Sequence, residues 1–328
     1  MKKGEIDLGE PSLFYEEEKE PEEQVFKILF TGLDGAGKTS IILALQNEFS
    51  KISSVEPTRG AQRRVFKLMG REISEWDLGG QRSYLISYIK NPSKYFGDTE
   101  VAIYVIDILD GSRILESLSY LHDVVETFRK LDIHPPINIF FHKYDPKLIH
   151  NVKVQIDNEI NKIKNEILET LNYDEVYFFE TSIYNPGTLI NAISKILLEL
   201  FPKSQLIQRT VEEFAGKLKC ESLLIINKNS ILLGSYFKDQ NSKQLLLNAI
   251  AYFLSLNDVF EGMQLEKKED HIIVKKSEKY FLFKPIILKE EDIQHYILVL
   301  KKHESFDISM INQNFTVFVK IFNDILKN

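Results

Sequence analysis

The stretch VFKILFTGLDGAGKTS, residues 25–40, joins a short apolar run to a glycine-rich loop and then to a helix-forming segment. Residues 32–39 match the pattern G-x-x-x-x-G-K-[ST], in which glycines let the backbone wrap closely and successive N–H groups point into one hollow. We expect a helix to begin near Gly37 and to add its positive end. Lys38 then reaches the β- and γ-phosphates, and the Thr39 hydroxyl ligates Mg²⁺. The stretch predicts a phosphate-binding loop, and the alternative is a glycine turn beside an exposed lysine.

Short apolar runs and amphipathic stretches alternate from residue 25 to residue 201. Alternation of this kind predicts an α/β fold, a mostly parallel sheet with helices on both faces. The strands are expected at 25–31, 64–70, 72–78, 101–109, 137–143 and 175–181, and the helices at 38–49, 112–131, 150–171 and 186–201.

The pattern changes after Pro202 to the order α-β-β-α-β-β-β-α, which is typical of an α+β module with an antiparallel sheet. We therefore divide the chain into a flexible acidic tail (1–24), an α/β domain (25–202) and an α+β domain (203–328). The expected helices of the last domain are 204–218, 240–257 and 308–327, and its expected strands are 222–228, 230–237, 262–268, 279–288 and 293–302.

Composition excludes several classes of protein. The chain has 328 residues, 44% of them hydrophobic and 27% charged, which suits two globular domains. A formal net charge of −7 argues against a nucleic-acid binder. Cys220 is the only cysteine, which predicts a reducing compartment without disulfides. We find no signal peptide and no apolar run of about 20 residues, so we expect a cytoplasmic protein without direct membrane insertion, recruited to membranes only through a partner.

Two further motifs, EPTRG (56–60) and WDLGGQ (76–81), follow the phosphate loop. Together with GLDGAGKTS they resemble the small GTPases of the Ras superfamily, and their wording is similar to the Arf-like branch. The resemblance implies that Thr58 binds Mg²⁺ and the γ-phosphate, and that Asp77 holds Mg²⁺ through water. It also implies that Gly80 donates its N–H to the γ-phosphate and that Gln81 orients the attacking water. Arg59 is either an arginine finger in cis or a partner-facing residue.

A third motif lies in FFHKYDPKLI, residues 140–149. His142-Lys143-Tyr144-Asp145 is similar to the H-K-x-D form of the guanine motif in Rag/Gtr GTPases, and 181–183 resembles the T-S-I stretch of that branch. Asp145 would then accept hydrogen bonds from guanine N1 and N2, which adenine cannot supply. The Lys143 stem would cover the purine, and an N–H near Ser182 and Ile183 would meet guanine O6. His142 replaces an asparagine that ties this motif to the phosphate loop, and an imidazole can still make one such hydrogen bond.

The resemblance thus implies a P-loop GTPase domain followed by a roadblock/longin-like domain, with Mg²⁺ and GTP or GDP as ligands. We expect a molecular switch that slowly hydrolyses GTP, served by activating and exchange proteins; the alternative is a nucleotide-binding scaffold without turnover. The catalytic residues are Gln81, Lys38 and Thr58, and the metal residues are Thr39, Thr58 and Asp77. The nucleotide-binding residues are Asp34, Gly35, Ala36, Gly37, Lys38, Thr39, Ser40, Gly80, His142, Lys143, Asp145, Ser182 and Ile183.

The last helix carries apolar side chains around much of its circumference, so it needs two neighbours. Roadblock domains of this family imply a homo- or heterodimer through this region, and the alternative is that the first domain covers the second face. The apolar residues concerned are Met310, Ile311, Phe315, Val317, Phe318, Val319, Ile321, Phe322 and Ile325.

Overall fold

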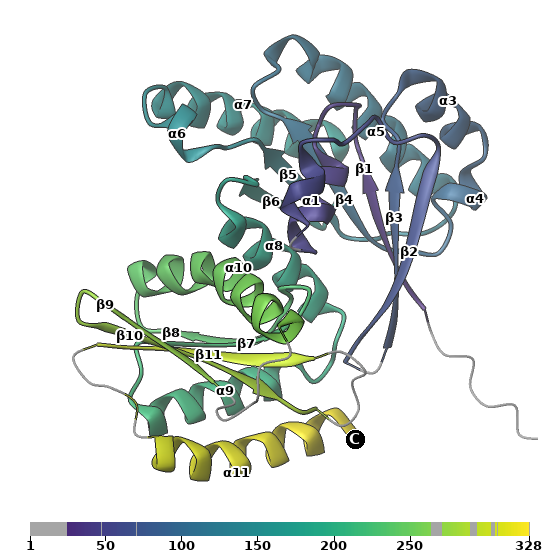
Figure 1. The fold of residues 1–328 in the computed structure, drawn as a ribbon. Coiled ribbons are helices and arrows are strands. Elements are labelled where there is room, and N and C mark those ends of the chain that lie inside the picture. The colour runs from purple at the N-terminus through teal and green to yellow at the C-terminus, as the bar shows by residue number, and fades with distance from the viewer. Residues whose placement is uncertain are drawn as a thin grey trace, which may run out of the picture.

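The computed structural model describes residues 25–46, 48–69, 71–263, 271–288, 294–302, 306 and 308–327. The expected acidic tail, 1–24, lies outside these residues. Two β-sheets follow one another along the chain, and each is covered by helices on both faces (Figure 1). Among the described residues, no helix combines the length and the apolar character that a membrane crossing requires.

The first sheet has six strands in the order β2-β3-β1-β4-β5-β6. All neighbouring pairs are parallel except β2 with β3, which are antiparallel. The expected α/β fold with a mostly parallel sheet is confirmed. The strands are β1 (Phe26–Thr31), β2 (Ala61–Leu68), β3 (Arg71–Leu78), β4 (Thr99–Asp107), β5 (Ile137–His142) and β6 (Val176–Thr181).

Strand β1 shows why both faces of this sheet are covered. Successive side chains of a strand point to opposite faces. Phe26, Ile28 and Phe30 belong to one apolar core, whereas Leu29 belongs to the other. Because both sets are buried, the strand is apolar except at Lys27 and Thr31, which are buried as well. Because the strands β3, β1, β4, β5 and β6 run parallel, their carboxyl ends lie at one edge of the sheet, where the loops carrying the predicted motifs meet.

Helices of the first sheet pack against these two cores, with α1 and α8 on one face and α3, α5 and α7 on the other. The helices are α1 (Lys38–Leu45), α2 (Phe49–Ile52), α3 (Arg82–Lys90), α4 (Pro92–Tyr95), η1 (Gly111–Arg113), α5 (Ile114–Lys130), α6 (Pro146–Ile149), α7 (Lys153–Leu171) and α8 (Pro186–Glu199).

The second sheet has five antiparallel strands in the order β8-β7-β11-β10-β9. Helix α10 covers one face, and α9 and α11 cover the other (Figure 1). The predicted order α-β-β-α-β-β-β-α is confirmed. The elements are α9 (Ser204–Leu218), β7 (Ser222–Asn227), β8 (Leu232–Phe237), α10 (Gln240–Gly262), β9 (Ile272–Lys276), β10 (Lys279–Ile286), β11 (His295–Lys302) and α11 (Ile308–Lys327).

The predicted strand at 262–268 is wrong at its start and otherwise falls on residues outside the described ranges. Helix α10 continues to Gly262, and the strand that pairs with β10 is β9. Asn257, expected to end the helix, instead lies on its surface and donates to Glu261 Oε1 one turn later, at 3.0 Å. A polar residue that bonds within the helix does not terminate it.

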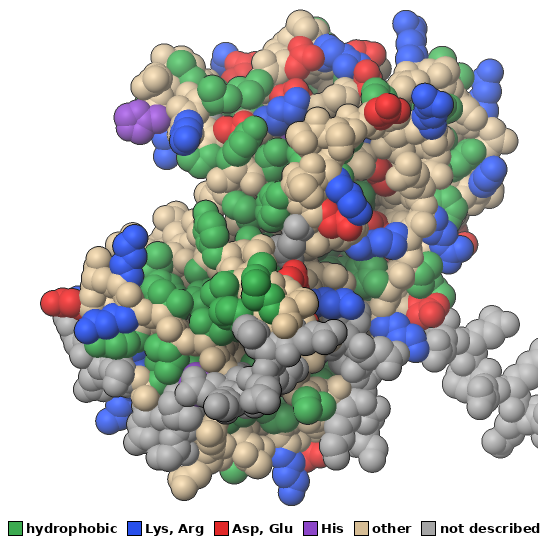
Figure 2. Space-filling model, viewed as in Figure 1, with side chains coloured by type: hydrophobic (Ala, Val, Ile, Leu, Met, Phe, Trp, Pro, Cys, Tyr) green, Lys and Arg blue, Asp and Glu red, His purple; other side chains and the backbone are tan. Residues whose placement is uncertain are grey.

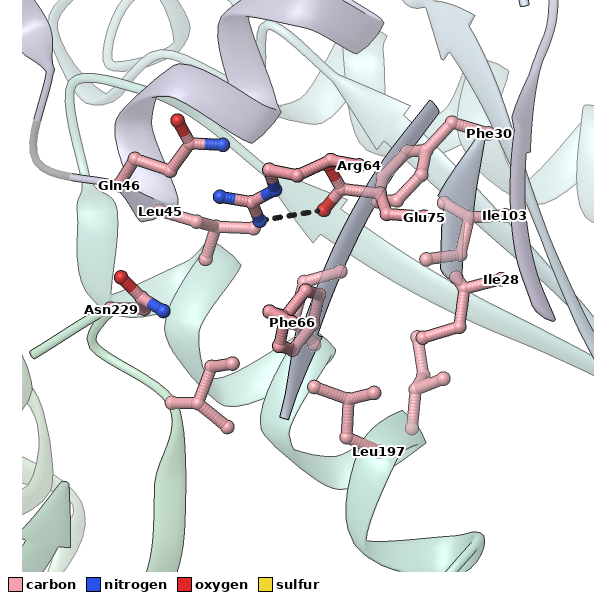
Figure 3. A pocket seen from close by; sticks show the side chains of 13 residues that line it. Ile28, Phe30, Leu45, Gln46, Arg64, Phe66, Glu75, Ile103, Leu197 and Asn229 are labelled. Carbon is pink, nitrogen blue, oxygen red and sulfur yellow. Dashed lines mark hydrogen bonds and ion pairs between the residues drawn. The ribbon is translucent and has the colours of Figure 1, made fainter. Parts of the chain in front are cut away.

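The two sheets share one apolar core, which runs from β1 through α8 to β7 and β11. Ser194 of α8 accepts a hydrogen bond of 2.8 Å from the buried Leu232 N–H of β8. A small cavity lies at this junction, where the Arg64–Glu75 ion pair of β2 and β3 faces the turn that carries Asn229 (Figure 3). The first sheet therefore contacts the second one through packed side chains.

Candidate functional site

The phosphate loop connects β1 to α1 in the predicted strand-loop-helix arrangement. Gly35 and Gly37 have φ values of 73° and 98°, which L side chains rarely adopt. A Cβ on Gly37 would also lie 2.6 Å from His142 Cδ2. The loop therefore needs glycine at Gly37 both for its backbone and for the space that His142 occupies.

Lys38 is folded back onto the loop. Its Nζ donates to the carbonyl oxygens of Gly32 at 2.8 Å and Leu33 at 2.9 Å. Burial lowers the pKa of Lys38 to about 8, and the carboxylates of Asp77 and Asp34 counteract this effect. A buried cation above an anion-binding loop is suited to bind a phosphate, which would bring a stronger negative partner than two carbonyls.

Three side-chain oxygens converge beside Lys38. The Thr39 hydroxyl donates to Asp77 Oδ2 at 2.6 Å and lies 2.7 Å from Thr58 Oγ1. The Thr58 hydroxyl is 3.3 Å from the same Asp77 oxygen. Asp77 Oδ1 is buried and has no hydrogen-bond partner among the described residues. Hydroxyl and carboxylate oxygens are the ligands that Mg²⁺ prefers, and an unsatisfied buried carboxylate oxygen favours a bound cation or its water. The residues present therefore fit Mg²⁺.

The loops that carry EPTRG and WDLGGQ contact each other and the phosphate loop. Gly79 N–H donates to Gly60 O at 2.9 Å, and Asp34 N–H donates to Gly80 O at 3.1 Å. A Cβ on Gly80 would lie 2.1 Å from Asp34 N, so no larger residue fits there. Between these loops lies a cavity of about 270 Å³. Its lining includes Asp34, Gly35, Gly37, Lys38, Thr39, Ser40, Thr58, Gly80 and Gln81.

Gln81 directly precedes α3, and its carbonyl accepts the N–H groups of Tyr84 and Leu85. The start of α3 thus fixes the Gln81 backbone, and Gln81 lines the same cavity as Thr58. Arg59 follows Thr58, but it does not belong to the lining of this cavity. The geometry thus gives no support to Arg59 as a finger in cis.

The third motif lies where β5 and β6 end. Asp145 is buried and accepts a hydrogen bond of 2.5 Å from Ser182 Oγ. Tyr144 N–H donates to Thr181 O at 3.0 Å, which joins the two loops. Ser182 N–H is engaged by Thr188 Oγ1 at 3.1 Å. The neighbouring Ile183 N–H has no partner among the described residues, so it is the amide left to meet a carbonyl of a ligand.

His142 is buried, and its Nδ1 lies 2.9 Å from Thr181 Oγ1. Its hydrogen bond therefore goes to β6 and not to the phosphate loop, which the ring contacts only by packing against Gly37. Burial, with a smaller effect from the cation of Lys143, lowers the pKa of His142 to about 3. The ring is neutral at physiological pH, so it links the two loops without adding charge.

Sequence reasoning missed two residues of this site. Asp107, at the end of β4, accepts from Lys143 Nζ at 2.6 Å, while Lys143 has a left-handed backbone (φ 63°). Arg113, in η1, binds Asp34 of the phosphate loop at 2.8 Å. An acidic residue at the end of a buried strand was a usable signal for Asp107. No local pattern connects Arg113 to a loop 79 residues earlier.

The model of the Gtr1/RagA G protein conserved region matches residues 27–254, from β1 into α10. The chain belongs to the Gtr1/RagA G protein family. The Arf-like likeness rests on GLDGAGKTS, EPTRG and WDLGGQ, which all belong to the first sheet and its loops, whereas this family match reaches both sheets. The family assignment agrees with the H-K-x-D form of the third motif.

Arf-like relatives match shorter segments of this Gtr1/RagA family member. ADP-ribosylation factor-like protein alp41 of Schizosaccharomyces pombe is 39% identical over 103 residues, 31% of this chain and 52% of that protein. ADP-ribosylation factor-like protein 3 of Chlamydomonas reinhardtii is 36% identical over 119 residues, 36% of this chain and 63% of that protein. The chain thus spans less than two thirds of the length of either relative. The predicted mixture of Arf-like and Rag/Gtr-like features is confirmed.

Among solved structures, the Arl6 BBS3 small GTPase of Trypanosoma brucei with the bound nucleotide analogue GppNp is similar to this chain. The TM-score is 0.39 at 16% identity, and the match covers 53% of this chain and 96% of that one.

Proposed function

We propose that this chain is a molecular switch that binds GTP or GDP with Mg²⁺ and slowly hydrolyses GTP to GDP and phosphate. The observation that supports this proposal most strongly is the convergence of Lys38, Thr39, Thr58, Asp77 and Gln81 beside the phosphate loop. Family membership and the Arf-like relatives agree with it.

The base would lie against the third motif. Asp145, held by the Ser182 hydroxyl, offers carboxylate oxygens to guanine N1 and N2. Ile183 N–H would donate to guanine O6. The aliphatic stem of Lys143 would cover the purine ring, while Asp107 holds the Lys143 ammonium group. Adenine carries neither the N1–H nor the N2 donors, so it would leave the Asp145 carboxylate unpaired at a cost that excludes it.

Hydrolysis would depend on position and charge. Bound Mg²⁺ would neutralise charge on the phosphates. Lys38 would exchange the Gly32 and Leu33 carbonyls for phosphate oxygens, and Thr58 would close its loop over the γ-phosphate. Gln81 would orient the attacking water. Without a further cation we expect a turnover on the order of 10⁻³ s⁻¹ or less, so an activating partner would set the physiological rate.

The second sheet with α9, α10 and α11 would form a roadblock-like module for dimerisation or docking. Its described surface supports this role, because hydrophobic side chains gather on the outer face of α10 (Figure 2). Tyr252 and Val259 of α10 are 78% and 52% exposed, and Met263, directly after the helix, is 65% exposed. A patch of this kind is typical of an interaction site.

Single-turnover hydrolysis of GTP, with excess protein and Mg²⁺, tests the enzymatic part of the proposal. We expect phosphate release from the wild-type chain and at least a tenfold slower release from Gln81→Leu, with nucleotide affinity preserved. ATP, as a matched control, should be neither bound nor hydrolysed. If GTP is bound tightly but the wild type and Gln81→Leu release phosphate at the same background rate, the chain is a scaffold and not a switch.

A further inference from the structure

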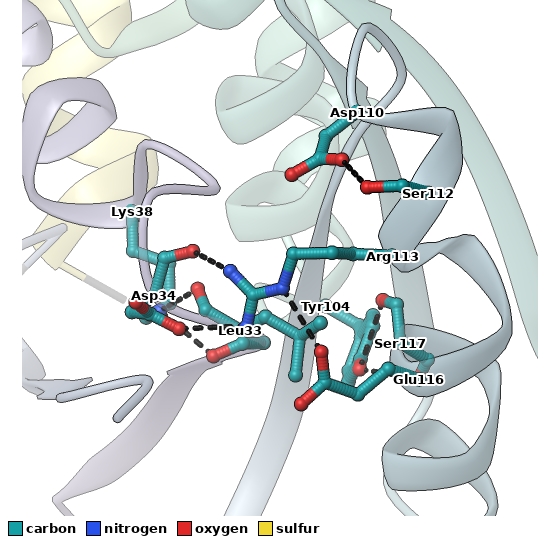
Figure 4. A network of polar contacts seen from close by, with 10 residues as sticks. Leu33, Asp34, Lys38, Tyr104, Asp110, Ser112, Arg113, Glu116 and Ser117 are labelled. Atoms are coloured by element: carbon teal, nitrogen blue, oxygen red, sulfur yellow. Dashed lines mark hydrogen bonds and ion pairs between the residues drawn. The ribbon is translucent and has the colours of Figure 1, made fainter. Parts of the chain in front are cut away.

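Helix η1 places a guanidinium group against the tip of the phosphate loop (Figure 4). Arg113 Nη2 donates to Asp34 Oδ1 at 2.8 Å, and its Nη1 donates to the Asp34 carbonyl oxygen at 3.1 Å. On the other side, Arg113 Nε donates to Glu116 Oε2 at 2.9 Å. Three hydrogen bonds thus fix the planar fork, and two of them end on a single residue of the loop.

Asp34 occupies a sensitive position. Its backbone N–H donates to Gly80 O, so it joins the phosphate loop to the loop that carries Gln81. Asp34 lines the 270 Å³ cavity with Lys38 and Thr39, and it also lines a second cavity of about 260 Å³ with Lys143. A carboxylate at this place lies beside the space assigned to the phosphates.

Two negative groups at close range repel each other, so the Asp34 carboxylate would oppose a phosphate bound in this cavity. The guanidinium of Arg113 offsets this repulsion, because it pairs with the Asp34 carboxylate directly. GTP carries one more phosphate charge than GDP. An uncompensated Asp34 would therefore oppose GTP more than GDP.

We propose that Arg113 is a positioning and charge-compensating residue of the nucleotide site, and that it sets the preference for GTP over GDP by neutralising Asp34. This inference rests on the proposed function. Glu116 contributes indirectly, because it holds the fork in the orientation that reaches Asp34. Arg113 and Asp34 are about one third and just under half exposed, so added salt screens the pair and should weaken the effect.

A double-mutant cycle tests the inference on the full chain, with fluorescent GDP and a non-hydrolysable GTP analogue as probes. For Arg113→Ala we expect about tenfold weaker binding of the GTP analogue and a clearly smaller loss for GDP. Adding Asp34→Asn should restore the GTP analogue to within about threefold of wild type, since the repelling charge is gone. Arg209→Ala, an exposed arginine on α9, matches the change in net charge and should alter neither affinity.

A purely structural role for Arg113 gives a different pattern. Both nucleotides would then weaken equally, and the added Asp34→Asn would rescue nothing; this result overturns the inference. Arg113→Lys keeps the positive charge but loses the planar guanidinium fork, and it should preserve the preference for the GTP analogue. This variant keeps the test decisive if Arg113→Ala fails to fold. Failure of the wild-type chain to bind either probe would refute the proposed function itself, before any variant is compared.

Discussion

At the scale of single residues, His142 shows how one substitution changes the way two loops are joined. The ring fills the space beside Gly37 and bonds to Thr181, so it connects the phosphate loop, β5 and β6 without a charge. Its structural role could be predicted from its place in the motif. Its partner could not, because Thr181 lies 39 residues away and comes close only once β5 and β6 pair.

Burial of His142 predicts a pH dependence of stability. The pKa of His142 is lowered from its ordinary 6.5 to about 3, so below pH 6.5 the unfolded chain binds a proton that the folded protein refuses. Stability contributed by this group is complete above pH 6.5 and is lost as the pH falls towards 3. Between pH 7.5 and pH 5 the loss amounts to about 2 kcal/mol.

Urea denaturation of the nucleotide-free chain at pH 7.5 and pH 5.0 measures this loss. The free energy of unfolding should decrease less for His142→Asn than for wild type between the two pH values. His122→Asn, on the exposed face of α5, controls for the removal of a histidine and should behave like wild type. An equal decrease in His142→Asn and wild type would show that the buried imidazole titrates normally.

At the scale of elements, strongly patterned segments were predictable. The phosphate loop and the five parallel strands of the first sheet carry local signals, apolar runs bounded by turn residues, that are independent of distant contacts. Helix α10 lacked such a signal at its end, since Asn257 bonds to both Glu261 and the Tyr296 hydroxyl of β11. Long-range partners of this kind also hid Arg113, because tertiary packing alone brings it to Asp34.

Helix α11 carries a second exposed apolar surface, on the opposite face of the second sheet from α10. Phe318, Phe322 and Ile325 are buried, and Phe318 stacks on Phe214 of α9 with ring centroids 4.3 Å apart. Val317 and Ile321, one turn apart on another side of the helix, are 55% and 42% exposed. The packing of α11 against α9 and the second sheet thus accounts for only one of the two faces that the sequence predicts to be apolar.

We expect the full chain to dimerise through this exposed side of α11. Light scattering at increasing concentration should show a rising mass for wild type and a constant monomer mass for Val317→Glu, because a charge in an apolar interface costs more than it costs in water. Val154→Glu is the control: it also replaces an exposed valine (70%) by glutamate, but on α7 of the first sheet, and this variant should dimerise like wild type. A wild-type monomer at the highest concentration, or dimers of Val317→Glu, would contradict this role of α11.

At the scale of the whole molecule, helix α8 connects the proposed nucleotide site with the second sheet. It follows the loop that holds Ser182 and Ile183, buries Leu189, Ile193 and Ile196 in the shared core, and contacts α10. The division of the chain near residue 202 stays a prediction. The apolar core is continuous across residue 202. Unfolding one sheet would expose apolar side chains of the other to water, so we expect each sheet to stabilise the other.

Ser194 tests whether the two sheets unfold together. Ser194→Ala removes the acceptor of the buried Leu232 N–H, and the unpaired amide should lower the free energy of unfolding by about 1–3 kcal/mol. Trp76, the only tryptophan, lies in β3 and reports on the first sheet by fluorescence, while hydrogen exchange of β7 and β11 reports on the second. If the core is one cooperative unit, Ser194→Ala shifts both signals to the same lower midpoint.

Thr170→Ala on the exposed side of α7 is the control, and it should change the free energy of unfolding by no more than about 0.5 kcal/mol in either signal. An unchanged Trp76 transition together with faster exchange in β7 and β11 would instead mean that the sheets unfold independently, and that coupling between the nucleotide site and the second sheet does not pass through α8.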